Sequence, residues 1–222
     1  MTGPAERLSA QEYLAAIYEM GEEHLPINQA AVARWMGVSA PSASEAVKRL
    51  RRDGMVDPTS RDLALTPSGH TAAERIVRRH RLAERFLVDI LGLPWHQAHE
   101  EAEVWEHAIS DAVEDRIVIM LDDPATCVHG NPIPGSGRPV DQSDLRPLRE
   151  FAPEARVVLE RLTEDLELDH GVMKYFEDGG LMPGATIRVH DVAPDGTMTI
   201  DVAGRLVGLG HHLTDNLWVR AS

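Results

Sequence analysis

Two stretches decide the fold, HRLAERFLVDILGL (residues 80–93) and AHEEAEVWEHAISDAVEDRI (residues 98–117). Both have helical periodicity, so polar side chains three or four positions apart share one face. The imidazoles and carboxylates that recur at this spacing are His80, Glu84, His99, Glu103, Glu106 and His107. A solvated face would mix Lys or Arg with the acids, but residues 99–115 contain neither. Because clustered carboxylates repel one another unless a cation lies between them, the pattern predicts a metal site.

The composition is that of a globular protein with enough apolar residues to form a hydrophobic core. Its 222 residues, 43% of them hydrophobic, suffice for one large or two modest domains. No apolar run approaches 18 residues and no charged-then-apolar leader is present, so we expect no membrane span, no secretory signal and a cytoplasmic location. The single Cys127 cannot form an internal disulfide and belongs to no C-x-x-C metal motif.

The net charge of −14 is distributed unevenly along the chain. Residues 1–82 hold 11 Lys and Arg against 10 Asp and Glu, a net of +1, whereas residues 83–222 hold 11 against 26, a net of −15. The acidity therefore does not exclude nucleic acid as a partner of the N-terminal part. The basic residues Lys48, Arg49, Arg51 and Arg52 in this part can contact phosphates.

The N-terminal part has the order of elements of a winged helix-turn-helix. Ser9 is expected to cap a helix through residues 10–20, a second helix fits residues 27–37, and Ser39 opens a third through residue 54. Residues 55–67 alternate as two short strands around a turn, which predicts a wing. A generic three-helix domain with an ordinary hairpin remains the alternative. The predicted DNA-binding residues include small polar residues that can approach bases and basic residues that can hold phosphates. They are Ser39, Pro41, Ser42, Ser44, Glu45, Lys48, Arg49, Arg51 and Arg52.

The rest of the chain predicts a helical region followed by a small β-domain. Thr66 and Pro67 begin a long helix, and Pro94 begins the next, expected to run unbroken to residue 121 and to end in an apolar surface suited to dimerisation. Residues 122–147 are rich in Pro, Gly, Asp and Ser, which favours a turn and a flexible tether. Strands around residues 155–202, interrupted by a short helix, then predict a small antiparallel barrel.

The whole arrangement resembles the diphtheria toxin repressor family of metal-dependent regulators over nearly the full chain. The resemblance is carried by EYLAAIYE, SAPSASEAVKRLRRDGMV, RRHRLAER, AHEEAEVWEHAISD and GNPIPG. It implies an α+β fold with three parts: a winged helix-turn-helix domain at 1–73, a helical metal-binding and dimerisation domain with a proline-rich linker at 74–149, and an SH3-like domain at 150–222. It also implies no enzyme activity but repression of metal-uptake genes by a metal-bound homodimer on operator DNA.

The resemblance further implies two metal sites. The primary site is similar to Glu12, Glu103, Glu106 and His107. The ancillary site is similar to His80, Glu84 and His99, to which the third domain is expected to add Glu167 and His170.

The expected metal follows from two departures from the iron-responsive branch. That branch has Met at the position of Glu12 and Cys at the position of Glu103, whereas this chain offers hard carboxylate oxygens. Hard ligands favour Mn²⁺, with Fe²⁺ and Co²⁺ as alternatives. The compact manganese regulators also have a carboxylate where Ala15 stands here, so their binuclear site is not expected in the same form.

Two other classes of function fit the sequence less well. A helical carboxylate metalloenzyme or metal store would use E-x-x-H or H-E-x-x-H, but Glu103 and His107 are four apart and the segment from His99 ends in Glu103. A winged-helix regulator of an organic ligand would explain the N-terminal part but not the stripe of His and Glu.

Overall fold

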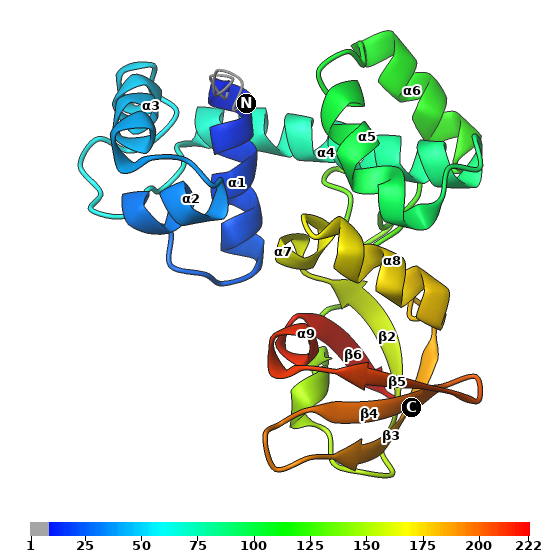
Figure 1. The fold of residues 1–222 in the computed structure, drawn as a ribbon. Helices are drawn as coiled ribbons and strands as arrows, with labels where there is room; N and C mark the ends of the chain where they lie inside the picture. Colours follow the sequence, from blue (N-terminus) through cyan, green and yellow to red (C-terminus); the bar gives the residue numbers. More distant parts are fainter. Residues whose placement is uncertain (1–8) are drawn as a thin grey trace, which may run out of the picture. The chain divides into compact units, whose positions relative to one another are not determined.

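The computed structural model describes residues 9–222, which divide into two compact units, one ending at Arg78 and the other comprising Arg79–Ser222 (Figure 1). The predicted mixture of helices and sheet is confirmed. The first eight residues of the predicted domain 1–73 lie outside the described range. In residues 9–222, no helix is both long and apolar enough to cross a membrane.

The first unit contains three short helices: α1 (Ala10–Glu22), α2 (Gln29–Trp35) and α3 (Ala40–Arg52). The predicted caps are confirmed, because the side-chain oxygens of Ser9 and Ser39 accept backbone N–H groups of Glu12 and Ser42. Their apolar faces meet in one core, which contains Tyr13, Ile17, Val32, Val47 and Leu50 among others. The core leaves the opposite face of α3 in solvent.

The wing is shorter than predicted. The two expected strands reduce to a single antiparallel bridge between Val56 and Leu65. α4 (Pro67–Asp89) follows, and the hydroxyl of Thr66 accepts the N–H of Gly69 at 3.1 Å. A Cβ at Gly69 would lie 1.9 Å from the carbonyl oxygen of Met55, so only glycine allows this close approach.

The helix predicted from Pro94 to residue 121 is broken, which corrects the sequence interpretation. η1 (Trp95–Gln97) and α5 (Ala98–Trp105) are followed by turns, and α6 (Asp111–Met120) begins afresh after Ser110. Ser110 has extended backbone, and Asp111 and Glu114 in the next turn favour a new helix N-terminus. The predicted i, i+4, i+7, i+8 stripe therefore does not continue along one helix.

The C-terminal part is a six-stranded antiparallel sheet with strand order β1-β6-β2-β3-β4-β5. Its strands are β1 (Arg146–Pro147), β2 (Arg156–Leu162), β3 (Thr186–Val192), β4 (Met198–Val202), β5 (Arg205–Leu209) and β6 (Leu217–Ala221). The helical turns η2 (Leu148–Glu150), α7 (Glu164–Glu167), α8 (His170–Gly179) and α9 (His211–Asp215) lie between them. α8 is the predicted interrupting helix, and its Phe176 packs into the sheet's core.

The loop that includes Cys127 and His129 lies against β2. The N–H of Leu162 donates to the carbonyl of His129 at 3.0 Å. Gly130 has φ +91°, and a Cβ there would lie 2.0 Å from the carbonyl oxygen of Glu160. Only glycine therefore lets the loop approach the strand so closely. This contact brings part of the segment predicted as a turn and tether beside the second unit's polar cluster.

Candidate metal centre

A cluster of buried ionisable side chains lies inside the second unit. His80 and Glu84 come from α4, His99 from α5, His129 from the loop before the sheet, and Glu167 from α7. Glu84 and His129 are fully buried, and His80 and Glu167 nearly so. Buried charges are costly unless they are paired or hold a metal, so this concentration requires an explanation.

The carboxylate of Glu84 lies at the centre of the cluster. Its Oε1 accepts from His129 Nδ1 at 3.0 Å and from His80 Nε2 at 3.2 Å. His99 Nδ1 lies 3.1 Å from His80 Nε2 and 3.3 Å from Glu167 Oε2. Glu167 Oε2 also lies 2.8 Å from His129 Nδ1.

Two neighbours extend the cluster. Cys127, which is buried, is within metal-ligating reach of Glu84 and His129, and its sulfur accepts the backbone N–H of His129 at 3.3 Å. The amide of Asn131 donates to Glu167 Oε1 at 2.7 Å and so fixes that carboxylate. These contacts add a thiol and an orienting hydrogen bond to the predicted His and Glu ligands.

The carboxylates of the cluster hold protons on its histidines, and these protons supply the positive charge that a metal ion would otherwise supply. Burial lowers the pKa of His99, but its hydrogen bonds to Glu167 and Glu84 outweigh burial and raise that pKa to about 10. His80 and His129 are likewise held well above their usual pKa by the carboxylates. Burial favours a raised pKa for Glu84, yet the charges of His129 and His80 hold it well below its usual value. A bound cation would replace these protons.

The available atoms fit a divalent ion. Three groups of potential ligands lie within 4.8 Å among the described residues: His80, Glu84 and His99; Glu84, Cys127 and His129; and His99, Glu164 and Glu167. Glu84 Oε2, His99 Nε2 and His129 Nε2 are buried without a hydrogen-bond partner in this structure. Unpartnered carboxylate oxygens, and ring nitrogens that have lost their protons, are the atoms that a metal ion would satisfy in a polar interior.

The predicted ancillary residues are brought together, and Glu167 lies among them. His170 does not join them: it is exposed at the start of α8, with its ring centroid 4.8 Å from that of His96. Whether any of these residues binds metal stays a prediction.

The predicted primary residues of the second unit lie where α5 ends. Glu106 is buried and its Oε2 accepts from His80 Nδ1 at 2.7 Å, so it bonds to the ancillary cluster. His107 Nε2 lies 3.4 Å from the other oxygen of Glu106, whereas Glu103 is largely exposed. These three residues form none of the potential ligand groups within residues 9–222, and their role stays a prediction.

Glu12 belongs to the first unit and has a local role. Its carboxylate accepts the N–H of Ser9 while the hydroxyl of Ser9 accepts the N–H of Glu12, a reciprocal capping box. A metal would have to compete with this cap for the carboxylate.

Sequence reasoning missed Cys127 and His129. The available signal was the spacing C-x-H within residues 127–129, followed by the Gly130 turn. It is weak alone, because the partner Glu84 is 45 positions from His129 along the chain.

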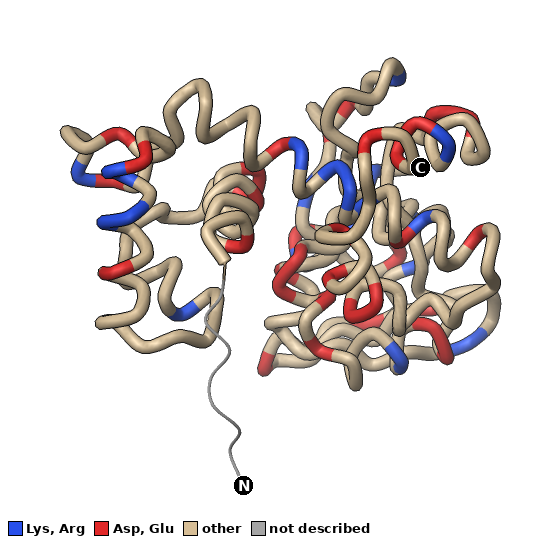
Figure 2. The backbone as a smooth tube through the Cα atoms, turned by 90° about the horizontal axis from the view of Figure 1, so that it is seen from above, with Lys and Arg blue, Asp and Glu red and all other residues tan. Residues whose placement is uncertain are grey.

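The predicted DNA-binding residues lie on and around α3. Ser39, Pro41, Ser42, Glu45, Lys48 and Arg52 are exposed, and Ser44, Arg49 and Arg51 are partly exposed. Figure 2 shows basic and acidic residues interspersed in this unit, and acidic residues frequent in the other. Arg51 has a second contact, since its Nη2 donates to the carbonyl of Ser60 at 3.0 Å and braces the wing.

Three family models match consecutive parts of the chain. Residues 8–62 match "Iron dependent repressor, N-terminal DNA binding domain", residues 66–135 match "Iron dependent repressor, metal binding and dimerisation domain", and residues 146–221 match the "FeoA domain". Together they leave only short segments unmatched.

Curated relatives and solved structures agree with these matches. The iron-dependent repressor IdeR of Mycobacterium tuberculosis is 38% identical over 207 residues, 88% of this chain and 89% of that protein. The diphtheria toxin repressor of Corynebacterium glutamicum is 40% identical over 192 residues, 82% and 83% of the two chains. The structure of a manganese-dependent transcriptional repressor in complex with manganese superposes with a TM-score of 0.85 at 34% identity, covering 96% of this chain and all of the other.

Proposed function

The chain belongs to the iron-dependent repressor, or diphtheria toxin repressor, family of metal-dependent DNA-binding repressors, and we propose that its activating metal is Mn²⁺. Family members are transcriptional repressors, so an enzyme or metal-store role is set aside. The observation that carries the manganese proposal is the pair of carboxylates at Glu12 and Glu103, where the iron-responsive branch has Met and Cys. Hard oxygen ligands suit Mn²⁺.

Fe²⁺ is the second candidate. Curated relatives at 37–38% identity are named iron-dependent repressors, while a solved structure at 34% identity is named a manganese-dependent one. Relatedness therefore supports both metals, and the chemistry of the ligands is the argument for Mn²⁺.

The proposed mechanism is a linkage between metal binding and DNA binding. Glu12 of α1 would hold one ion together with Glu103, Glu106 and His107. The ion would supply the positive charge that lets these carboxylates come together. Their shared ligation holds the DNA-binding unit to the helical unit. Two recognition helices of a dimer can then enter successive major grooves of an operator.

We propose that the buried cluster is the ancillary site. Its ligand residues are His80, Glu84, His99, His129 and Glu167, and Cys127 lies beside them. Its support is the set of buried carboxylate oxygens and ring nitrogens that have no hydrogen-bond partner among the described residues. In this role the cluster fixes α4, α5 and the loop before the sheet in one arrangement.

Dimerisation through the helical region is proposed on exposed apolar surface. Val104, Val113, Ile119 and Met120 of α5 and α6 are 68%, 49%, 67% and 56% exposed. Several large apolar side chains exposed on two consecutive helices are typical of an interaction surface. The homodimer is expected to act in the cytoplasm on operators of metal-uptake genes.

An operator-binding titration tests the metal. Genomic DNA is selected with protein loaded with mixed divalent ions, and metal-free protein is then titrated on it by fluorescence anisotropy with Mn²⁺, Co²⁺ or anaerobic Fe²⁺. We expect Mn²⁺ to activate wild-type binding, and Glu103→Cys to weaken the Mn²⁺ response at least tenfold relative to Co²⁺ and Fe²⁺. Glu100→Cys, on the exposed face of α5, is the matched control. Wild-type protein that responds to Fe²⁺ and ignores Mn²⁺ would overturn the proposal.

A further inference from the structure

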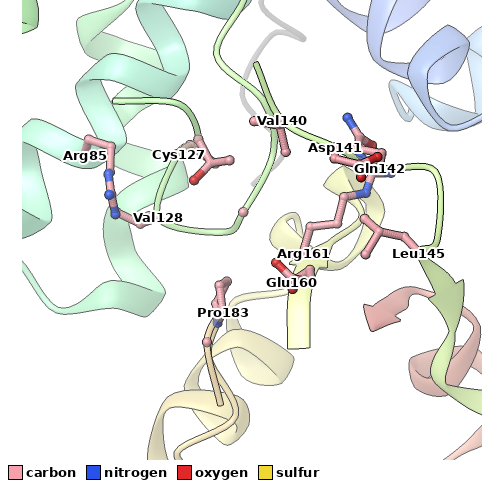
Figure 3. A pocket seen from close by; sticks show the side chains of 13 residues that line it. Arg85, Cys127, Val128, Val140, Asp141, Gln142, Leu145, Glu160, Arg161 and Pro183 are labelled. Carbon is pink, nitrogen blue, oxygen red and sulfur yellow. The ribbon is translucent and has the colours of Figure 1, made fainter. Parts of the chain in front are cut away.

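A cavity of about 310 Å³ lies in the second unit beside the buried cluster, with which it shares Cys127 as a lining residue (Figure 3). Its walls come from the loop at 126–130, the linker at 140–145, the end of β2 and residues 183–184. Arg85 of α4 and Arg161 of β2 both line it. A volume of this size is at the lower end of the range of small-molecule sites.

The position of Arg161 follows from an irregularity in β2. The register shifts between Leu159 and Arg161, so Arg161 lies directly opposite Trp218 of β6. Trp218 alternates with the buried Leu217 and Val219, which places it and Arg161 on the face away from the sheet's core. The guanidinium carbon lies 5.6 Å from the Trp218 ring centroid.

Arg161 is nevertheless only 4% exposed, because the loop and the linker cover this face of the sheet. Among residues 9–222, its guanidinium forms no hydrogen bond or ion pair, and its recorded contact is the face of Trp218. Buried charges in proteins are normally paired. The charge of Arg161 instead lines a cavity.

The nearby acids are bonded to other groups. Glu160 Oε1 lies 3.3 Å from Nε of Arg220, and Arg220 Nη2 donates to the carbonyl of Asp141 at 2.6 Å. Asp141 Oδ1 accepts from the N–H and the hydroxyl of Ser143, which lowers the pKa of Asp141. Neither acid forms an ion pair with Arg161 in the part of the chain that the structure describes.

Other donors around the cavity are also short of acceptors. Nε of Arg85 is buried without a hydrogen bond, although it lies 3.4 Å from Asp89 Oδ2. The indole Nε1 of Trp218, whose ring contacts Arg161 but does not line the cavity, is likewise buried without a hydrogen bond. Unmatched donors and a buried cation together call for an anionic oxygen ligand.

We propose that this cavity binds a small organic acid, with its carboxylate on Arg161 and its carbon chain against Val140, Leu145 and Pro183. A carboxylate matches the fork of an arginine in two parallel hydrogen bonds. The apolar side chains on the linker side favour a ligand with a hydrocarbon part over a bare inorganic oxyanion. The site is independent of which metal activates the protein.

Binding is tested by calorimetry on full-length, metal-free protein, so that carboxylate–metal complexes cannot imitate a binding signal. The probes are hexanoate, acetate and inorganic phosphate at up to about 10 mM. Hexanoate is expected to bind one per chain and more tightly than acetate or phosphate. Arg161→Gln should weaken it at least about tenfold, the loss expected when a charge-assisted hydrogen bond is removed. Arg188→Gln, at an exposed arginine of β3, is the matched control and should bind as wild type.

A second variant keeps the test decisive if Arg161→Gln fails to fold. Val140→Phe fills the cavity from the linker and leaves Arg161 in place, so it should abolish hexanoate binding without changing the melting temperature greatly. The proposal is overturned if no probe binds, or if Val140→Phe binds hexanoate as wild type does. Phosphate binding as tight as hexanoate binding, lost in the same variant, would overturn the organic-acid assignment in favour of an inorganic oxyanion.

Discussion

Replacing Glu84 by Gln isolates the contribution of the buried cluster. Glu84 is fully buried, accepts from two imidazoles at 3.0 and 3.2 Å, and belongs to two of the three potential ligand groups among the described residues. The substitution keeps the shape of the side chain but removes its charge. His80 and His129 then lose the carboxylate that holds their pKa above the usual value.

The expected magnitude follows from burial. Removing one partner of a buried charge network costs about 3–5 kcal/mol, and for a chain of this size each kcal/mol lowers the melting temperature by about 2–4 °C. Metal-free Glu84→Gln should therefore melt roughly 6–20 °C below wild type. As a ligand, Glu84 should also matter for Mn²⁺: the variant is expected to lose at least about tenfold in affinity at one site, or about 1.4 kcal/mol.

The assay pairs thermal unfolding of metal-free protein with Mn²⁺ calorimetry, and Glu74→Gln is its control. Glu74 also follows a histidine by four positions on α4, but its pair with His70 at 3.4 Å is solvent-exposed. Such pairs contribute less than about 0.5 kcal/mol. If Glu84→Gln matched Glu74→Gln in melting temperature, Mn²⁺ stoichiometry and affinity, the cluster would be neither a charge network nor a metal site.

Three further changes probe the protons, the DNA and the dimer. The raised pKa of about 10 keeps His99 protonated at neutral pH, whereas a metal ligand must be neutral, so Mn²⁺ affinity should rise with pH up to about that value. Calorimetry in buffers of different ionisation enthalpy measures the proton release, and a pH-independent affinity would contradict this prediction. Arg52→Ala should weaken binding to all DNA sequences alike and reduce the salt slope by about one, and an unchanged slope would exclude a phosphate contact. If the exposed apolar side chains of α5 and α6 form the proposed dimer surface, Ile119→Asp should sediment as a monomer, whereas Leu206→Asp, at a similarly exposed position on β5, should sediment as wild type does.

Local signals in the sequence predicted the starts of α1, α3 and α4. Ser9, Ser39 and Thr66 bond to backbone N–H groups within three residues, so their role depends only on neighbouring sequence. The break after α5 was missed because the stripe of acids and the apolar residues continue through it. Only the Ser110 and Asp111 start signal marks the new helix.

The ancillary cluster was predictable only in part. His80 and Glu84 are neighbours along one helix, so spacing alone pairs them. His129 reaches Glu84 because Gly130 lets a loop lie against β2, a contact set by tertiary structure. Glu167 meets His99 through the same docking of the sheet domain. No periodicity encodes such contacts.

Cys127 changes the argument about metal choice. The preference for Mn²⁺ was inferred with this thiol outside the motif, but its position beside Glu84 and His129 gives the buried cluster a soft donor. Burial, with Glu84 nearby, raises the pKa of the thiol to about 12, so it yields its proton only to an ion that binds sulfur strongly. Mn²⁺ is a poor ion for that task and Zn²⁺ or Fe²⁺ a better one. The thiol of the buried cluster thus favours Zn²⁺ or Fe²⁺, whereas the carboxylates of Glu12 and Glu103 favour Mn²⁺. Of the two proposed sets, only the one with Glu12 and Glu103 includes a residue from the DNA-binding unit, so we expect its hard ligands to select the metal that controls DNA binding.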